Sequence, residues 1–252
     1  MLDGDSRMTA SGAITATDAG WDIALDVGID RITPERLVAF WPIPMKPRTR
    51  NWIATNLSNG QLMDLATGLR IQPGQPTQFA LGFEFAGNDI KFLRHIPPIN
   101  HAVGVASIVD SRLTVSLDAG VVQAPQGGPM DLAGSHFAID DMRLNPSPAI
   151  LDLQIDSSLT AALSVLNQPP FEYMDKANLP VTLADGRAVT KGQIAWPLVP
   201  RPAPEAITVA MTSQLRSVRS ETLLPERLFA APALQVTVSR AGINIAGAVQ
   251  VG

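Results

Sequence analysis

The residues of this chain that could do chemistry are three histidines and a few neighbouring carboxylates. A Ser-His-Asp triad can be written from Ser135, His136 and Asp140, with the histidine taking the proton of a serine nucleophile. The surrounding residues, Ala133-Gly134-Ser135-His136-Phe137, lack the glycine-flanked turn that exposes such a nucleophile. We therefore expect no serine hydrolase site.

Metal and thiol chemistry also lack candidates. His95 and His101 flank Ile96-Pro97-Pro98, and no carboxylate stands at a metal-ligand spacing from both. The chain has no cysteine, which excludes disulfides, thiolate catalysis and cysteine metal sites. We expect no metal and no cofactor.

Carboxylate pairs that flank one bond could hydrolyse glycosides. Asp140 and Asp141 are adjacent, so on a strand they would point to opposite faces. Asp152 and Asp156 lie on the polar side of an alternating segment, where solubility explains them. The sequence therefore predicts no catalytic residue and no enzymatic activity.

The elements that would position any site are mostly strands. Trp21, Ile23, Leu25, Val27 and Ile29 alternate with Asp22, Ala24, Asp26, Gly28 and Asp30, which gives one apolar and one acidic or small face. Turn residues separate further alternating segments of the same kind, which contain Met63–Ile71, Phe79–Phe85, Leu113–Val121, Leu151–Ile155, Ile207–Met211, Leu234–Val238 and Ile243–Val249.

Helical signals are few and short. Thr33-Pro34-Glu35 predicts a helix start that Pro42 ends, and further helices are expected over 47–57 and 158–166. The hexapeptide at 34–39 resembles the one at 225–230; a repeat of this kind would fit an array of β units punctuated by short helices, and a chance match is the alternative. We expect a mainly β fold, an elongated, twisted antiparallel sheet with a few short helices.

Composition limits the class of protein. Hydrophobic residues make up 46% and charged residues 17%, yet no apolar run is long enough to span a membrane as a helix. A net charge of −4 leaves no basic stripe for nucleic acid. The basic cluster Lys46, Arg48 and Arg50 is most simply a solvated helix face.

Four prolines within Pro197–Pro204 predict a bend or a weak boundary between segments 1–196 and 197–252. The N-terminus lacks a signal peptide, and alternation follows almost at once. We expect that the chain begins inside a longer protein, with any membrane anchor upstream.

One-sided strands have two interpretations. In a closed sandwich two apolar faces pack together as a core, whereas in an open, curved sheet they line a groove that an apolar ligand occupies. The alternating pattern is the same in both cases.

The segments Phe40-Trp41-Pro42, Arg50-Asn51-Trp52 and Asn56-Leu57-Ser58-Asn59-Gly60 resemble the central region of YhdP-like proteins of the AsmA-like superfamily. Phe83-Glu84-Phe85 and Gln193–Leu198 also look familial. The resemblance covers most of the chain as a fragment and is densest from Trp21 to Val122.

The resemblance implies a taco-like β-groove in the periplasm, tethered to the bacterial inner membrane by a segment absent from this chain. Such proteins are linked to moving phospholipid toward the outer membrane without enzymatic activity. The implied partners are phospholipid and the remainder of the same polypeptide, not nucleic acid. The alternative is a structural or envelope-assembly β module with a closed, dry core and no lipid cargo.

On the groove interpretation, the large apolar residues of three alternating segments would line the groove. Lys46, Arg48 and Arg50 are weaker candidates for contacts with lipid head groups. The predicted lining residues are Trp21, Ile23, Leu25, Val27, Phe79, Leu81, Phe83, Leu113, Val115 and Leu117.

Overall fold

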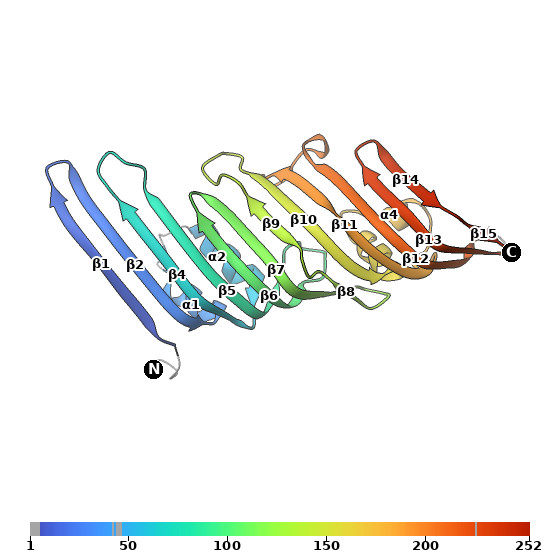
Figure 1. The fold of residues 1–252 in the computed structure, drawn as a ribbon, viewed down its shortest axis with the longest axis horizontal. Coiled ribbons are helices and arrows are strands. Elements are labelled where there is room, and N and C mark those ends of the chain that lie inside the picture. The colour runs from blue at the N-terminus through green and yellow to red at the C-terminus, as the bar shows by residue number, and fades with distance from the viewer. Residues whose placement is uncertain (1–5, 42, 44–46, 225) are drawn as a thin grey trace.

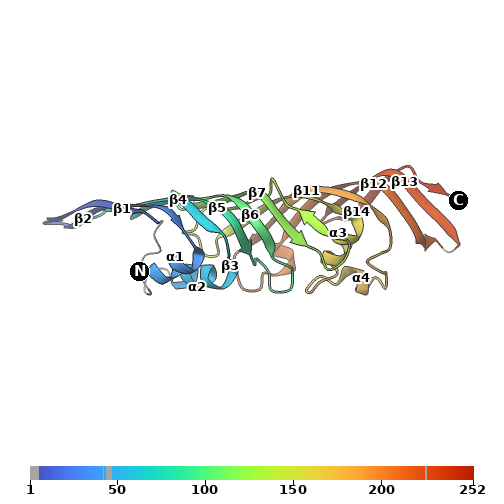
Figure 2. The same cartoon turned by 90° about the horizontal axis from the view of Figure 1, so that it is seen from below.

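A computed structural model describes residues 6–41, 43, 47–224 and 226–252. Fifteen strands form one antiparallel sheet, which is elongated and twisted (Figure 1). Short helices lie on one side of this sheet (Figure 2). The prediction of a mainly β fold with a few short helices is confirmed.

The strands follow one another across the sheet nearly in chain order. β8 and β9 together form one interrupted strand between β7 and β10. The strands are β1 Met8–Thr17, β2 Gly20–Ile32, β3 Leu57–Ser58, β4 Gln61–Ile71, β5 Gln78–Ile90, β6 Ile99–Val109, β7 Arg112–Gln123, β8 Pro129–Asp131, β9 His136–Ile139, β10 Pro148–Ser158, β11 Asp185–Pro197, β12 Thr208–Leu224, β13 Arg227–Ser239, β14 Gly242–Gly247 and β15 Gln250–Val251.

Because neighbouring strands are antiparallel, successive connections alternate between the two ends of the strands. One end carries connections without an α-helix, among them the turns at 18–19 and 110–111 and the longer segment 198–207. The other end carries the connections at 33–60, 91–98 and 159–184, and the first and third of these contain the helices α1 to α4. We call the two ends of the strands the hairpin end and the helix end.

Helices α1 and α3 begin where their capping residues predict. α1 (Pro34–Phe40) starts after Thr33, whose Oγ1 accepts a hydrogen bond from the Arg36 amide at 3.4 Å. α3 (Leu159–Leu166) starts after Ser158, whose Oγ accepts from the Ala161 amide at 3.0 Å. α2 spans Pro47–Asn56, and two further short elements are α4 (Tyr173–Lys176) and the 3₁₀ turn η1 (Pro204–Ala206).

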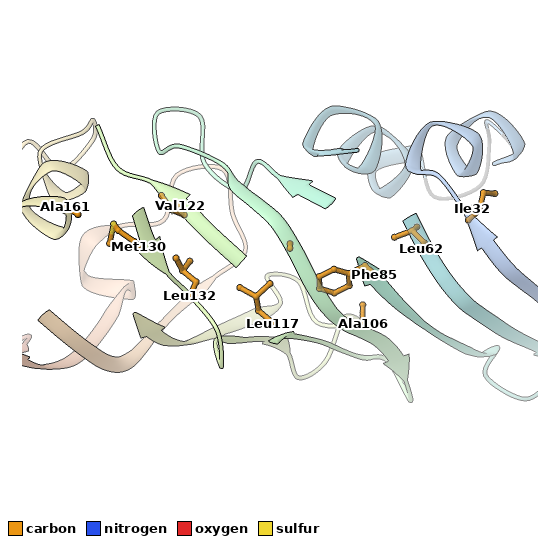
Figure 3. Packing of buried hydrophobic residues seen from close by; sticks show 10 residues of the cluster. Ile32, Leu62, Phe85, Ala106, Leu117, Val122, Met130, Leu132 and Ala161 are labelled. Atoms are coloured by element: carbon orange, nitrogen blue, oxygen red, sulfur yellow. The ribbon is translucent and has the colours of Figure 1, made fainter. Parts of the chain in front are cut away.

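The main hydrophobic core lies toward the helix end, between the sheet and the helices. Phe85 and Leu117 lie at its centre, and Met130 lies toward Ala161 of α3 (Figure 3). Leu37 of α1 and Val165 of α3 pack against this cluster. Residues from strands far apart in the chain therefore share one core because the helices cover the same face of the sheet.

A second, smaller core joins β11, β12 and β13 through Ala188, Leu215, Val218, Ala231 and Leu234. The sheet continues across the proline-rich segment, since β11 pairs with β12 from Ala195↔Thr208 to Asp185↔Arg219. Residues 198–207 form the connection between these two strands.

Candidate functional site

All ten predicted lining residues lie on one face of the sheet, which we call the apolar face. Cross-strand partners share a face, and the pairs Ile23↔Ile71, Leu69↔Phe79 and Leu81↔Ile108 join β2 to β4, β5 and β6. The pairs Ile108↔Leu113 and Ala106↔Val115 extend the same face to β7. The register therefore brings together three segments that are up to 96 residues apart in the chain.

The apolar face continues beyond these residues into the C-terminal part of the sheet. Val115 pairs with Phe137, Phe137 with Leu151, and Leu151 with Ile194. The rings of Phe137 and Trp196 lie 6.1 Å apart across this region. The sequence predicted most of these strands but did not name their apolar residues among the lining residues of the groove. These further residues of the apolar face are Phe137, Leu151, Ile194, Trp196, Val209, Met211, Val236, Val238, Ile243 and Ile245.

Exposure of the apolar face is graded along the strands. At the helix end, Phe85 is 4% exposed and Leu117 is 7% exposed. Toward the hairpin end, Phe79 is 44%, Leu25 is 40% and Trp21 is 61% exposed. Helices thus cover one half of the apolar face, while the other half leaves large apolar side chains in contact with solvent.

Gly104 shapes the covered half. It pairs with Phe85 and Leu117 on its two neighbours, and a Cβ placed on it would lie 2.7 Å from the Phe85 ring. A glycine here lets the phenylalanine ring lie directly against the backbone of β6.

The opposite face of the sheet, called the polar face, carries charged residues that pair with each other, although Val105 and Val109 are also exposed on it. Asp26 accepts two hydrogen bonds of 2.9 Å from Arg70 Nη2, and Arg187 donates two of 2.8 Å to Asp156. The Gln193 amide donates to Asp152 at 2.8 Å. Asp152 and Asp156 therefore both have hydrogen-bond partners on this face.

A shallow depression of about 680 Å³ lies on this polar face, not on the apolar face. Its floor contains small residues, among them Gly28, Ala66, Gly68 and Ala80, and the Asp26–Arg70 pair borders it. The small side chains explain the depression, although Val27 and Phe79 of the apolar face also contribute to its lining.

Of the three predicted head-group residues, only Arg50 has a described side chain. Its Nη2 donates to the Val38 carbonyl at 3.1 Å and so fastens α2 to α1. Arg48 lies in α2, but its side chain is outside the described part, and Lys46 is outside the described residues altogether. The hydrogen bond of Arg50 therefore stabilises the packing of α2 against α1.

The residues considered for hydrolysis are not assembled. Ser135 is buried, and its Oγ both donates to and accepts from the backbone of Gln154, at 3.1 Å each. His136 Nδ1 lies 3.0 Å from Ser116 Oγ on the polar face. Asp140 forms an ion pair with Arg112 at 3.3 Å, so these three residues do not form a triad.

Two carboxylates have lowered pKa values for local reasons. The Arg143 side chain, and then the Arg143 amide, hydrogen-bond to Asp141 and lower its pKa to about 2. Backbone amides, the Arg7 amide foremost and then that of Arg31, lower the pKa of Asp30. Both groups are stabilised in the ionised form by these hydrogen bonds.

Within the described part of the chain, no three histidine or acidic residues are grouped closely enough to hold a metal ion. None of the described helices has the length and apolar character that crossing a bilayer needs. Comparison of the chain with protein-family models, curated proteins and solved structures found no match. The function must therefore be argued from the two faces of the sheet.

Proposed function

We propose that this chain is a non-enzymatic segment of a periplasmic, inner-membrane-anchored lipid-transfer protein. In this proposal, phospholipid acyl chains lie along the apolar face and move across the strands toward the outer membrane. The compartment, the anchor and the direction come from the resemblance of the Trp52–Gly60 element to YhdP-like proteins.

The observation that carries the proposal is the uncovered half of the apolar face. All described strands belong to one sheet, so no second sheet packs on the exposed side chains of Trp21, Leu25 and Phe79. Soluble proteins rarely leave a large continuous apolar surface in water without a partner for it. Acyl chains fit this surface because they need no hydrogen bonds from it.

The charges on the polar face also favour a lipid whose acyl chains lie on the apolar face. Its charged residues pair with each other across strands, as Asp26–Arg70 and Asp156–Arg187 do. Among the described residues, the strands turn their charged side chains away from the apolar face. A phospholipid head group would therefore stay at the margin of the sheet, in water.

The test is to purify the chain without detergent and extract its bound lipid for mass spectrometry. Photo-crosslinking residues at Leu25 and Phe83 should capture phospholipid in cells, and the same residues at Ala24 and Glu84, one position away on the polar face, should not. Absence of co-purified phospholipid, together with equal capture at all four sites, would refute lipid carriage.

A second candidate is a structural or envelope-assembly module, and the edge strand β1 favours it. All ten residues of β1 are exposed, and none is charged or a proline. Its register with β2 has no bulge. Natural edge strands often carry charged residues, prolines or bulges that prevent another chain from pairing with them. Concentration-dependent association that Ala13→Lys abolishes, without any retained lipid, would favour this function.

A further inference from the structure

A second surface differs from both faces of the sheet. We call it the basic cap, and it consists of α1, α2 and the connection 91–98 between β5 and β6. These three segments contain five of the 19 Lys and Arg residues but only one of the 23 acidic residues, in a chain whose net charge is −4. The basic cap is therefore a positive region on an acidic protein.

The three segments are physically connected. The Lys91 amide donates to the Asn56 carbonyl at the end of α2, at 2.8 Å, and Leu57 pairs with Ile90. The Arg50 contact with the Val38 carbonyl joins α2 to α1. Figure 2 shows α1 and α2 beside each other on the helix side of the sheet.

The basic cap buries some of its apolar residues and exposes others. Leu37 and Leu57 pack against the main core, and Ile96 is 6% exposed. Four large apolar residues of the same segments remain in contact with solvent, with exposed fractions from 41% to 64%. These are Phe40, Trp52, Phe92 and Leu93. The inner residues anchor the segments to the core, and the outer ones present apolar surface to solvent.

Positive charge accompanies these exposed residues. Lys91 and Arg94 flank Phe92 and Leu93, and both are exposed. Neither forms an ion pair with another residue in the described part of the chain. Their charges are therefore available to a partner.

We propose that the basic cap docks on the surface of an anionic phospholipid bilayer. Trp and Phe side chains favour the boundary between head groups and acyl chains, and Lys and Arg are attracted to anionic lipid. Nucleic acid would satisfy the charges, but a phosphate backbone offers no apolar contact for Leu93 and Phe40. A bilayer surface satisfies both requirements.

The test is flotation of the full chain with vesicles, either phosphatidylcholine alone or phosphatidylcholine with 30% phosphatidylglycerol. The wild type should bind only the anionic vesicles, and less so as salt rises. Lys91→Gln with Arg94→Gln should weaken partitioning about 30-fold, and Trp52→Ala with Phe92→Ala about 10-fold or more. Arg201→Gln with Arg240→Gln, two exposed arginines in connections at the hairpin end, is the matched control and should bind like the wild type.

Circular dichroism confirms that each variant is folded before flotation. The inference is overturned if the wild type does not float with anionic vesicles, or if the cap variants float as well as the control. It is also overturned if the chain ignores vesicles but binds a fluorescent single-stranded oligonucleotide. Vesicle docking does not require an occupied apolar face, so it stands or falls separately from lipid carriage.

Discussion

Two phenylalanines on β5 offer a direct measure of how open the apolar face is. Phe79 and Phe85 are six residues apart on the same strand and share the apolar face, but they are 44% and 4% exposed. Truncation of each to alanine removes the same atoms from two differently covered halves of one surface. The difference in unfolding free energy then reports the difference in coverage.

The magnitudes follow from buried area. A wholly buried Phe side chain removes about 200 Å² from water, which at about 25 cal/mol per Å² corresponds to about 5 kcal/mol. Phe85→Ala should therefore cost about 4–5 kcal/mol, within the usual range for buried Phe→Ala changes. Phe79 hides little more than half of its surface, and its loss leaves no closed cavity, so Phe79→Ala should cost about 2–3 kcal/mol.

The assay is urea unfolding of both variants and the wild type, with thermal unfolding as a second measurement. A gap of about 2 kcal/mol corresponds to about 4–8 °C in Tm for a chain of this size. Phe92→Ala is the matched control, since Phe92 is 41% exposed outside the sheet and should resemble Phe79. Equal losses for Phe79→Ala and Phe85→Ala would mean that something covers the hairpin end in solution, and the open-face reasoning would be wrong.

Three further predictions concern local structure. Gly104→Val should destabilise the fold by about 3 kcal/mol in urea unfolding, because its side chain meets a neighbouring backbone carbonyl and a core ring. Ser158→Ala should cost about 1 kcal/mol through loss of the α3 cap, and Ser158→Asp should restore most of it. In an NMR titration the Asp141 carboxyl should stay ionised down to about pH 2, and Arg143→Gln should raise its pKa toward the usual value near 3.8. Because this pKa is lowered in the fold, the Asp141 contribution to stability is present above about pH 4 and is lost as pH falls through about 2.

Each of these has a contradicting result. Full stability of Gly104→Val would mean that β6 shifts away from its neighbours. If Ser158→Ala left the stability unchanged, packing alone would determine where α3 begins. If the pKa of Asp141 in the wild type lay near its usual value, the hydrogen bonds from Arg143 would not form in solution.

The sequence was most informative about strands and helix starts, because both depend on near neighbours. The alternation at Trp21–Asp30 lies within β2, and the side assigned to each residue agrees with the observed register. Thr33 and Ser158 are N-caps, as their hydroxyl groups predict. Period and capping are local properties that tertiary packing did not override here.

Where pairing with residues far away in the sequence decides the conformation, it could not be predicted from local patterns. Glu35-Arg36-Leu37 lies in a helix, whereas Arg227 and Leu228 of the similar hexapeptide lie in β13. The first copy follows a capping threonine, while the second belongs to a segment that pairs with β12 over most of its length. Similar residues thus adopt different structures, and the second copy does not form a helix like the first.

Whether the apolar strands would close into a sandwich was likewise open from the sequence. A period of two fixes which residues share a face but not what lies opposite that face. The structure has a single sheet because nearly every strand pairs with its neighbour in the chain, so the described strands never fold back over the apolar face. The connections that contain α1 and α3 return to it, and they cover the helix end.

The pairing of strands in chain order also determines how this molecule can come apart. Each strand contacts mainly the one before and the one after it, so stability is close to a sum over adjacent pairs, as in repeat proteins. The path of 12 strands spans about 50 Å at about 4.8 Å per strand. Pulling on the two ends should open the sheet strand by strand, like a zipper, with the helix-covered middle opening last. Duplication or deletion of a hairpin would then change the length of the sheet by about 10 Å and leave the rest of its pairing intact.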